Sequence, residues 1–238
     1  MKPAARLPLY LTLEDEDGFE EGLPEAIVPV VFTKTRRRLE GECYFGAYPV
    51  LRRFLTDYAD NPFSRQALDA LNKALLPYLD EIGYERAGGV YRYYRSFVLW
   101  DKRKLNADCI LPGTSLLTPS LLRKVKTNRT DFDLGWLLEK KLETAVILSP
   151  SGELLSLCSV NEHHPEQQLL ELTVYTLPAA RKRGFAASCA ALLTKTLLES
   201  KRGVVYVCSC HNAASIAVAK RIGLQSESRF YAVDAYKK

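Results

Sequence analysis

The sequence predicts a protein of the α/β (α+β) class. From residue 145 onward, short runs rich in aliphatic and β-branched residues alternate with two helical segments, in the order hairpin, strand, helix, strand, helix, strand. Residues 1–100 combine two helical periodicities with one run rich in Tyr, Phe and Val. We therefore expect two parts, an N-terminal α+β region over residues 1–100 and a C-terminal domain over residues 101–238.

The composition is that of a globular protein. The chain has 238 residues, of which 47% are hydrophobic and 26% are charged, so it can bury a sizeable core. No apolar run approaches the roughly 18 residues that span a bilayer, and the N-terminus lacks the apolar core of a signal peptide. We expect a cytoplasmic protein without a membrane partner. The net charge of +5 permits an anionic ligand but does not indicate a nucleic acid, and we do not expect one.

The cysteines and histidines do not form a metal-binding pattern. The six cysteines include no Cys-x-x-Cys pair, and most lie inside apolar runs, where a reduced and buried thiol is expected. His163 and His164 have no further His or Cys at a supporting spacing, so an exposed turn is expected there. We expect no metal.

The expected elements of the N-terminal region carry no recognisable chemistry. Residues 1–40 are expected to be irregular, because acidic residues, prolines and a basic run follow one another. One helix is expected from Pro49, and a second from about Pro62 with Asn61 as its cap. Residues 91–100 are expected to form a strand.

The pattern of apolar residues and turns predicts more elements in the C-terminal domain. A helix is expected over residues 115–126, and a Pro/Gly turn at residues 149–152 joins two strands. The expected strands are residues 145–148, 153–160, 169–177, 204–208 and 229–233, and the expected helices are residues 186–200 and 212–223.

The most informative segment is residues 177–186, Leu-Pro-Ala-Ala-Arg-Lys-Arg-Gly-Phe-Ala. A strand stops at Pro178 and the chain turns into a helix, whose first N–H groups have no partner within the helix. Those N–H groups and the helix dipole favour an anion, and Gly184 lets the backbone approach it closely. The cations at residues 181–183 add attraction for phosphate, so the segment suits a pyrophosphate. It lacks the Gly-Lys-Ser/Thr ending of a Walker loop and the three glycines of a dinucleotide-binding turn.

Two motifs resemble the GNAT superfamily of N-acetyltransferases. Arg181-x-x-Gly184-x-Ala186 is similar to the family's Arg/Gln-x-x-Gly-x-Gly/Ala signature, which lies between the fourth strand and the third helix. Asn212-x-x-Ser215 is similar to the family's Asn-x-x-Ala/Ser helix. The resemblance covers residues 145–236 and looks like a bacterial-type branch with an extra N-terminal region. It implies a mixed, twisted sheet flanked by helices, and transfer of acetyl from acetyl-coenzyme A (acetyl-CoA) directly to a primary amine.

The resemblance also implies which residues hold the co-substrate acetyl-CoA. Backbone groups of the fourth strand would pair with the pantetheine arm, and one would polarise the acetyl carbonyl. Backbone N–H groups of the loop would hold the pyrophosphate, and two side chains of the second motif would lie near the pantetheine or the sulfur. The residues of the fourth strand are Val174, Tyr175 and Thr176. The residues of the loop are Arg181, Lys182, Arg183, Gly184, Phe185 and Ala186, and those of the second motif are Asn212 and Ser215.

Glu171 is the candidate general base. At pH 7, an amine with a pKa near 10.4 is neutral in about one molecule in two thousand, whereas one with a pKa near 8 is neutral in roughly one in ten. Only the amine with the pKa near 10.4 needs a base. Glu171 opens the fourth strand, where related enzymes often carry a water-mediated base, and period 2 puts it on one face with Thr173 and Tyr175. A solvated charge at a strand end is the alternative interpretation.

The sequence departs from the GNAT pattern at Ala219, where many members have a tyrosine that reprotonates the leaving thiolate. Tyr231 and Ser215 are the candidate catalytic residues in its place, although Tyr231 also fits a strand-packing aromatic. The chain is therefore either an acetyltransferase with a small-molecule or protein acceptor, or a non-catalytic acyl-CoA sensor or interaction module. A third interpretation has RNA or a basic protein as the acceptor. The sequence indicates neither the acceptor nor the oligomeric state.

Overall fold

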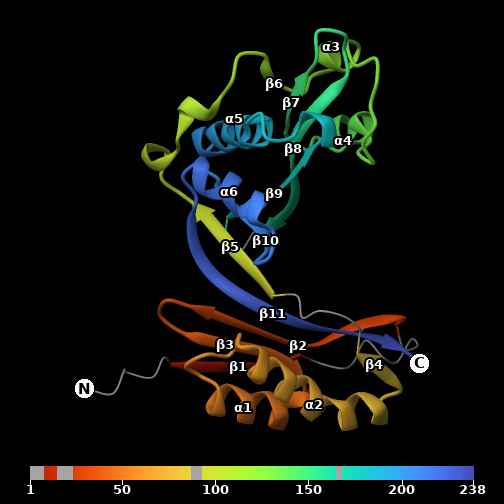
Figure 1. Cartoon of the computed structure of the whole chain (residues 1–238), viewed down its shortest axis with the longest axis vertical. Coiled ribbons are helices and arrows are strands. Elements are labelled where there is room, and N and C mark those ends of the chain that lie inside the picture. Colours follow the sequence, from red (N-terminus) through yellow and green to blue (C-terminus); the bar gives the residue numbers. More distant parts are fainter. Residues whose placement is uncertain (1–7, 15–23, 87–92, 165–167) are drawn as a thin grey trace. The chain divides into compact units, whose positions relative to one another are not determined.

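A computed structural model describes residues 8–14, 24–86, 93–164 and 168–238 of the chain (Figure 1). By its contacts the chain divides into unit 1, which comprises Met1–Arg95 and Glu227–Lys238, and unit 2, which comprises Ser96–Ser226. In both units helices pack on strands, and the strand pairs are of both parallel and antiparallel kinds. This confirms the predicted α/β (α+β) class with a mixed sheet flanked by helices. The predicted domain boundary after residue 100 stays a prediction.

Unit 1 is a layer of strands covered by two helices (Figure 1). The strand order is β1-β3-β2-β11, with β4 beside β11; β1 and β3 are parallel and the other pairs are antiparallel. The core between helices and strands includes Phe32, Leu51 and Leu71. The elements are β1 (Leu9–Glu14), β2 (Ala26–Thr35), β3 (Leu39–Tyr44), a 3-10 helix (Phe45–Ala47), α1 (Tyr48–Asp57), α2 (Arg65–Glu81), β4 (Tyr84–Arg86) and β11 (Gln225–Lys237).

The prediction of an irregular segment over residues 1–40 is wrong for β1, β2 and the start of β3. Pro29 argues against a strand in the sequence, because proline lacks the N–H that a central strand uses. The pairing of β11 with β2 shifts register between Val233 and Ala235, which pair with Val30 and Ile27. Pro29 lies between these two pairs, at a β-bulge where its missing N–H interrupts no ladder.

The two helices of unit 1 are confirmed, but the predicted cap of α2 is wrong. The cap is Ser64, whose Oγ accepts a hydrogen bond from the Ala67 N–H at 3.2 Å, and not Asn61. Residues 61–64 form a turn instead, with the Ser64 N–H bonded to the Asn61 carbonyl at 3.2 Å. This turn lets Phe63 enter the core, where it is 7% exposed.

Unit 2 has strands in the order β10-β9-β8-β7-β6, with a separate core on each face. β9 and β10 are parallel, and the other three pairs are antiparallel. Helices α5 and α6 supply the larger core and α4 supplies the smaller one. The elements are β5 (Tyr93–Leu99), which begins in unit 1, β6 (Thr114–Leu116), α3 (Pro119–Leu122), α4 (Leu134–Glu139), β7 (Thr144–Leu148), β8 (Leu154–His164), β9 (Leu169–Thr176), α5 (Phe185–Glu199), β10 (Gly203–Ser209) and α6 (Ala213–Arg221), with 3-10 helices at Lys102–Lys104, Ala107–Cys109 and Pro178–Ala180.

The hairpin, the strands β9 and β10 and the helices α5 and α6 form where the sequence predicts them. The helix predicted over residues 115–126 is wrong, since that segment holds β6 and only the short helix α3. Pro119 forces the preceding residue to be extended, and Thr118 caps the helix with its side chain. After α3 the chain is held against the β7–β8 turn by a bond from the Lys126 N–H to the Gly152 carbonyl at 2.8 Å.

Candidate functional site

Strands β9 and β10 separate part-way along their length. They pair in parallel at three positions only, from Gly203 opposite Leu169 to Val205 opposite Glu171. β9 then continues to Thr176 and β10 to Ser209, while the other edge of β9 stays paired with β8 as far as Thr176. Among the described residues, the inner edge of β9 therefore has no strand neighbour over residues 172–176. We call this opening the fork.

The backbone groups of Val174 and Thr176 face the fork. The Leu177 N–H donates to the Leu155 carbonyl on the β8 side at 2.9 Å, and backbone bonds alternate from one edge of an antiparallel strand to the other. Tyr175 therefore points its N–H and C=O at β8, whereas Val174 and Thr176 point theirs at the fork. An extended ligand in the fork would add to β9 as a strand does.

The loop after β9 ends in a helix N-terminus that no side chain caps. Gly184 is the N-cap of α5 and has a φ of 83°, in the left-handed region that favours glycine. The first bond of the helix joins the Ser188 N–H to the Gly184 carbonyl at 3.0 Å. The N–H groups of residues 185–187 thus have no partner within the helix and, with the dipole, form an anion-binding end.

Four cations surround this end of α5. The Arg181 Nε donates to the Thr176 carbonyl at 3.3 Å, and the Arg183 guanidinium lies 4.8 Å from the Phe185 ring centre. Lys182 lies between them in the loop. The fourth cation is Arg221 of α6, whose Nη1 lies 3.6 Å from the position that a Cβ on Gly184 would take. In the part of the chain that the structure describes, no carboxylate pairs with any of the four.

Sequence reasoning missed Arg221. Lys220 and Arg221 close α6, where cations complement the negative end of a helix, so they look like ordinary helix-ending residues. Only the packing of α6 beside α5 brings Arg221 to Gly184, 37 positions earlier in the chain.

Tyr206 is the second residue that the sequence did not single out. It follows Val205, the last residue of β10 that pairs with β9, and therefore lies at the base of the fork. Its ring is 6% exposed in the core shared with α5 and α6, and its hydroxyl forms a hydrogen bond with Ser215. Burial raises the pKa of the Tyr206 phenol, while this bond acts in the opposite direction. The phenol is protonated at neutral pH and can donate.

Glu171 lies at the base of the fork on the opposite face. Its neighbours Leu170 and Leu172 are buried in the core with α5, whereas Tyr175 packs with the α4 core, 6.2 Å from Phe132 between ring centres. Because side chains alternate along a strand, Glu171 shares the face of Tyr175. Its side chain is half-buried.

Asn212 and Ser215 lie at the start of α6. The Asn212 Oδ1 accepts a bond from the Ser215 N–H at 3.0 Å, so Asn212 is the cap of this helix. The cap presents the Ser215 hydroxyl to Tyr206 on β10. The Asn212-x-x-Ser215 motif therefore contacts the base of the fork through Ser215.

Tyr231 belongs to the core of unit 1. It is 2% exposed, contacts Phe32 with ring centres 5.7 Å apart, and accepts a hydrogen bond from the Asn72 Nδ2 at 2.9 Å. Burial raises the pKa of its phenol. These contacts match the strand-packing interpretation of Tyr231 from the sequence.

The buried thiols beside the fork are not nucleophiles. Burial raises the pKa of Cys189 from 9.0 to about 12 and that of Cys158 well above 9.0, so both stay protonated at neutral pH. Within the described residues, no group of three His, Cys, Asp or Glu could hold a metal ion. His163 and His164 end β8 instead of forming the predicted turn, because β8 continues by pairing with Leu169 and Leu170. No helix among the described residues is long and apolar enough to cross a membrane.

The raised pKa of Cys189 predicts a loss of stability in alkali. A group with a raised folded pKa stabilises fully below its unfolded pKa, and that stabilisation disappears as the pH rises from 9.0 toward 12. We expect the free energy of unfolding to fall over this range, with Cys189 contributing up to about 1.4 kcal/mol per pH unit. Urea titrations of the unaltered protein and of Cys189→Ala check this. Identical pH slopes for the two proteins would contradict it.

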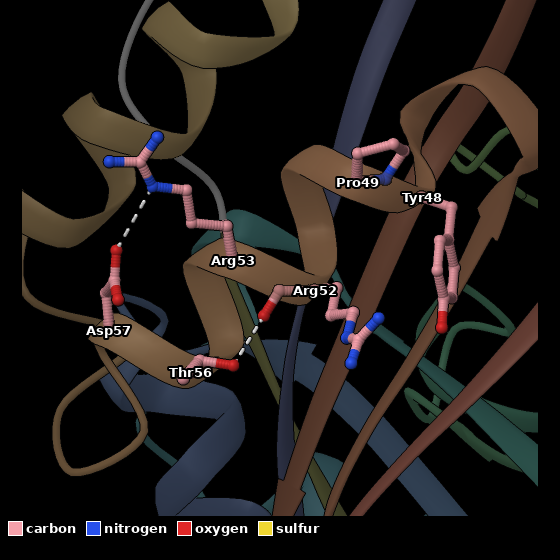
Figure 2. A pocket seen from close by; sticks show the side chains of 6 residues that line it. All are labelled: Tyr48, Pro49, Arg52, Arg53, Thr56 and Asp57. Atoms are coloured by element: carbon pink, nitrogen blue, oxygen red, sulfur yellow. Dashed lines mark hydrogen bonds and ion pairs between the residues drawn. The ribbon is translucent and has the colours of Figure 1, made fainter.

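A pocket on α1 of unit 1 offers no catalytic arrangement (Figure 2). It is lined by Tyr48, Pro49 and one face of the helix. The Arg53 Nε pairs with Asp57 at 3.5 Å, and the Thr56 hydroxyl donates to the Arg52 carbonyl at 2.8 Å. Both contacts are i,i+4 contacts along one helix, and the site of interest is the fork in unit 2.

Comparisons with known proteins agree with this location. Residues 116–225 match the family model described as "Acetyltransferase (GNAT) domain", and the match contains the fork, the loop and α6. No curated protein matches the sequence. Solved structures that are similar include a GNAT-family protein from Novosphingobium aromaticivorans, with 16% identity, coverage of 66% of this chain and 68% of that chain, and a TM-score of 0.48. A GCN5-related N-acetyltransferase from Sphaerobacter thermophilus has 13% identity, coverage of 93% of this chain and 85% of that chain, and a TM-score of 0.48. A GCN5-related N-acetyltransferase-like protein from Streptococcus suis has 18% identity, coverage of 71% of this chain and 76% of that chain, and a TM-score of 0.45. Residues 116–225 are therefore similar to an acetyltransferase (GNAT) domain, which confirms the resemblance found in the sequence.

Proposed function

We propose that the protein is an N-acetyltransferase that moves acetyl from acetyl-CoA directly to a primary amine of a small molecule or protein. The observation that carries the proposal is the fork between β9 and β10, placed next to an uncapped helix N-terminus. Acetyl-CoA carries its thioester on an extended arm that ends in a diphosphate. The fork would hold the arm, and the helix N-terminus would hold the diphosphate. We also propose a cytoplasmic location.

The diphosphate would be held by the N–H groups at the start of α5. Arg181, Lys182, Arg183 and Arg221 would neutralise it. The pantetheine would then run along β9, where the backbone groups of Val174 and the Thr176 N–H face the fork, and the nearer N–H would polarise the acetyl carbonyl. The thioester would thereby reach the base of the fork.

At the base, Glu171 and Tyr206 would act from opposite faces. Glu171 takes a proton from the ammonium form of the acceptor, and the neutral amine attacks the carbonyl carbon. As the carbon–sulfur bond breaks, the sulfur takes the proton of the Tyr206 hydroxyl, and the second proton that the nitrogen loses on becoming an amide returns to the tyrosinate. Ser215 would orient that hydroxyl. Tyr206 would thus replace the tyrosine that the GNAT pattern has at Ala219, which is fully buried here. The inert thiols of Cys158 and Cys189 favour direct transfer over an acyl-cysteine.

Tyr206→Phe is expected to lower kcat by about 10²-fold, the typical contribution of a general acid, with the Kd for acetyl-CoA unchanged. A panel of amines assayed for thiol release measures kcat, and a calorimetric titration measures Kd. Tyr231→Phe is the matched control: it should cost about 1 kcal/mol of stability through the lost bond to Asn72 and leave kcat unchanged. The reverse pattern, with kcat lost in Tyr231→Phe alone, would remove Tyr206 from the mechanism.

A non-catalytic acyl-CoA sensor is the second candidate, and Ala219 is the observation that favours it. The side chain is fully buried against α5, so nothing at that position reaches a ligand. A sensor would bind acetyl-CoA and release no thiol above background with any amine. Thiol release that needs both an amine and Glu171 would exclude it.

A further inference from the structure

Unit 2 has a basic hollow beside the β7–β8 turn that the proposed transfer reaction does not use. Its volume is about 490 Å³, and its lining includes Arg123, Lys124 and Lys126. Apolar side chains of Leu121, Val146 and Leu148 form part of its wall. A cationic rim above an apolar wall suits a ligand that carries an anionic group on an apolar body.

The turn holds the backbone of the segment that carries these cations. Gly152 has a φ of 85°, and a Cβ there would lie 2.6 Å from the Lys124 carbonyl, so only glycine lets the two segments meet. The Lys126 N–H then bonds to the Gly152 carbonyl at 2.8 Å, and Thr127 bridges to Glu153. The backbone that carries the cations is therefore fixed against the turn.

The positive charge of the hollow is not neutralised by the protein. The nearest carboxylate along the turn, Glu153, pairs with Arg129 at 3.4 Å. Across the described ranges, no ion pair involves Arg123, Lys124 or Lys126. The Ser149 and Ser151 hydroxyls of the turn hydrogen-bond to each other at 2.8 Å, which leaves one of the two O–H groups to donate elsewhere. Three unpaired cations beside one hydroxyl donor favour an oxyanion.

The hollow opens at the same end of the sheet as the α5 loop. Ile147, Ser156 and Thr176 form one row across β7, β8 and β9, and the chain leaves β7 into the turn and β9 into the loop just beyond this row. Two strand spacings, about 10 Å, separate the ends of β7 and β9. A ligand held at the fork can therefore extend an anionic group toward the hollow.

We propose that this hollow is a second anion site, which binds a phosphate or carboxylate of a ligand used by unit 2. Two sources share this chemistry: the 3′-phosphate of the coenzyme and an anionic group on the acceptor. The existence of the site is independent of the acetyltransferase proposal, whereas the choice between sources rests on it.

The test is a residue-resolved titration of the ¹⁵N-labelled full chain with inorganic phosphate at low salt, followed by NMR. Saturable shifts are expected at the Ser151 and Gly152 amides. Lys124→Glu, Lys126→Glu should weaken this binding about tenfold or more, because two attractive contacts become repulsive. Lys73→Glu, Lys140→Glu, with the same charge change elsewhere, should leave it unchanged. Absence of saturable shifts at residues 151 and 152, or equal affinity in the first variant, would overturn the site.

Acetyl-CoA and its 3′-dephospho form then distinguish the sources. Shifts at Gly152 with acetyl-CoA alone would assign the hollow to the 3′-phosphate. Shifts with inorganic phosphate but with neither coenzyme would assign it to the acceptor. The amides of Gly184 and Phe185 report separately on the coenzyme loop, so failure of the acetyltransferase proposal, seen as no shift there with acetyl-CoA, is distinguishable from failure of the second site.

Discussion

Arg181→Glu, Gly184→Asp is expected to weaken acetyl-CoA binding by at least about 10²-fold. The double change places two carboxylates where the diphosphate would lie, and it replaces one of four unpaired cations. The fold itself should tolerate it. A Cβ on Gly184 meets only the Arg221 guanidinium at 3.6 Å. The left-handed φ of 83° strains most side chains, but aspartate adopts such a φ more readily than most residues and favours the helix as an N-cap. Calorimetric titration measures the affinity, and urea unfolding checks the fold.

The matched control for this variant is Gly184→Asn. Asparagine tolerates the left-handed φ of 83° and has nearly the shape of aspartate without its charge. We expect Gly184→Asn to weaken binding by less than about tenfold, since only the close backbone approach is disturbed. Equal losses in Gly184→Asn and in Arg181→Glu, Gly184→Asp would mean that the shape of the loop, and not its charge, determines binding.

Glu171→Gln is expected to lower kcat by about 10²–10³-fold for an amine whose pKa is near 10.4. For an amine whose pKa is near 8, the loss should stay below about tenfold, because roughly one molecule in ten is already neutral at pH 7. The Kd for acetyl-CoA should not change, since Glu171 faces away from the core of α5. A lysine-like amine and an α-amine, assayed side by side for thiol release, measure the difference.

The pH dependence gives Glu171→Gln a second readout. With the base removed, the rate for the high-pKa amine should rise with pH as more of the amine becomes neutral, and the deficit should shrink in alkali. Equal deficits for both amines at all pH values would show that Glu171 positions the chain and does not accept the proton. No deficit for either would favour the solvated charge at a strand end.

The loop of the candidate site could be predicted because its chemistry is local. Pro178 ends the strand, Gly184 takes the left-handed conformation, and the helix after it begins without a capping side chain. The alternation of Glu171 and Tyr175 against Leu172 is also local, since it follows from the period of a strand.

The rest of the site depends on long-range packing. Arg221 lies at Gly184 only because α6 packs beside α5, and Tyr206 is at the base of the fork only because pairing with β9 stops at Val205. In the sequence both look like ordinary helix-ending and strand residues. The same holds for the fold. Pro29 fits in β2 because a bulge in the pairing with β11 accommodates it. Residues 115–126 do not form one helix, and the Lys126 N–H bonds to the Gly152 carbonyl of the β7–β8 turn instead.

Calorimetric titration of the unaltered protein with acetyl-CoA is the most direct test of the central claim, that the fork and the α5 loop bind this thioester. We expect saturable binding at one site per chain, which the Arg181→Glu, Gly184→Asp variant loses while remaining folded. A folded, unaltered protein that shows no heat of binding and no gain in thermal stability with saturating acetyl-CoA would contradict it.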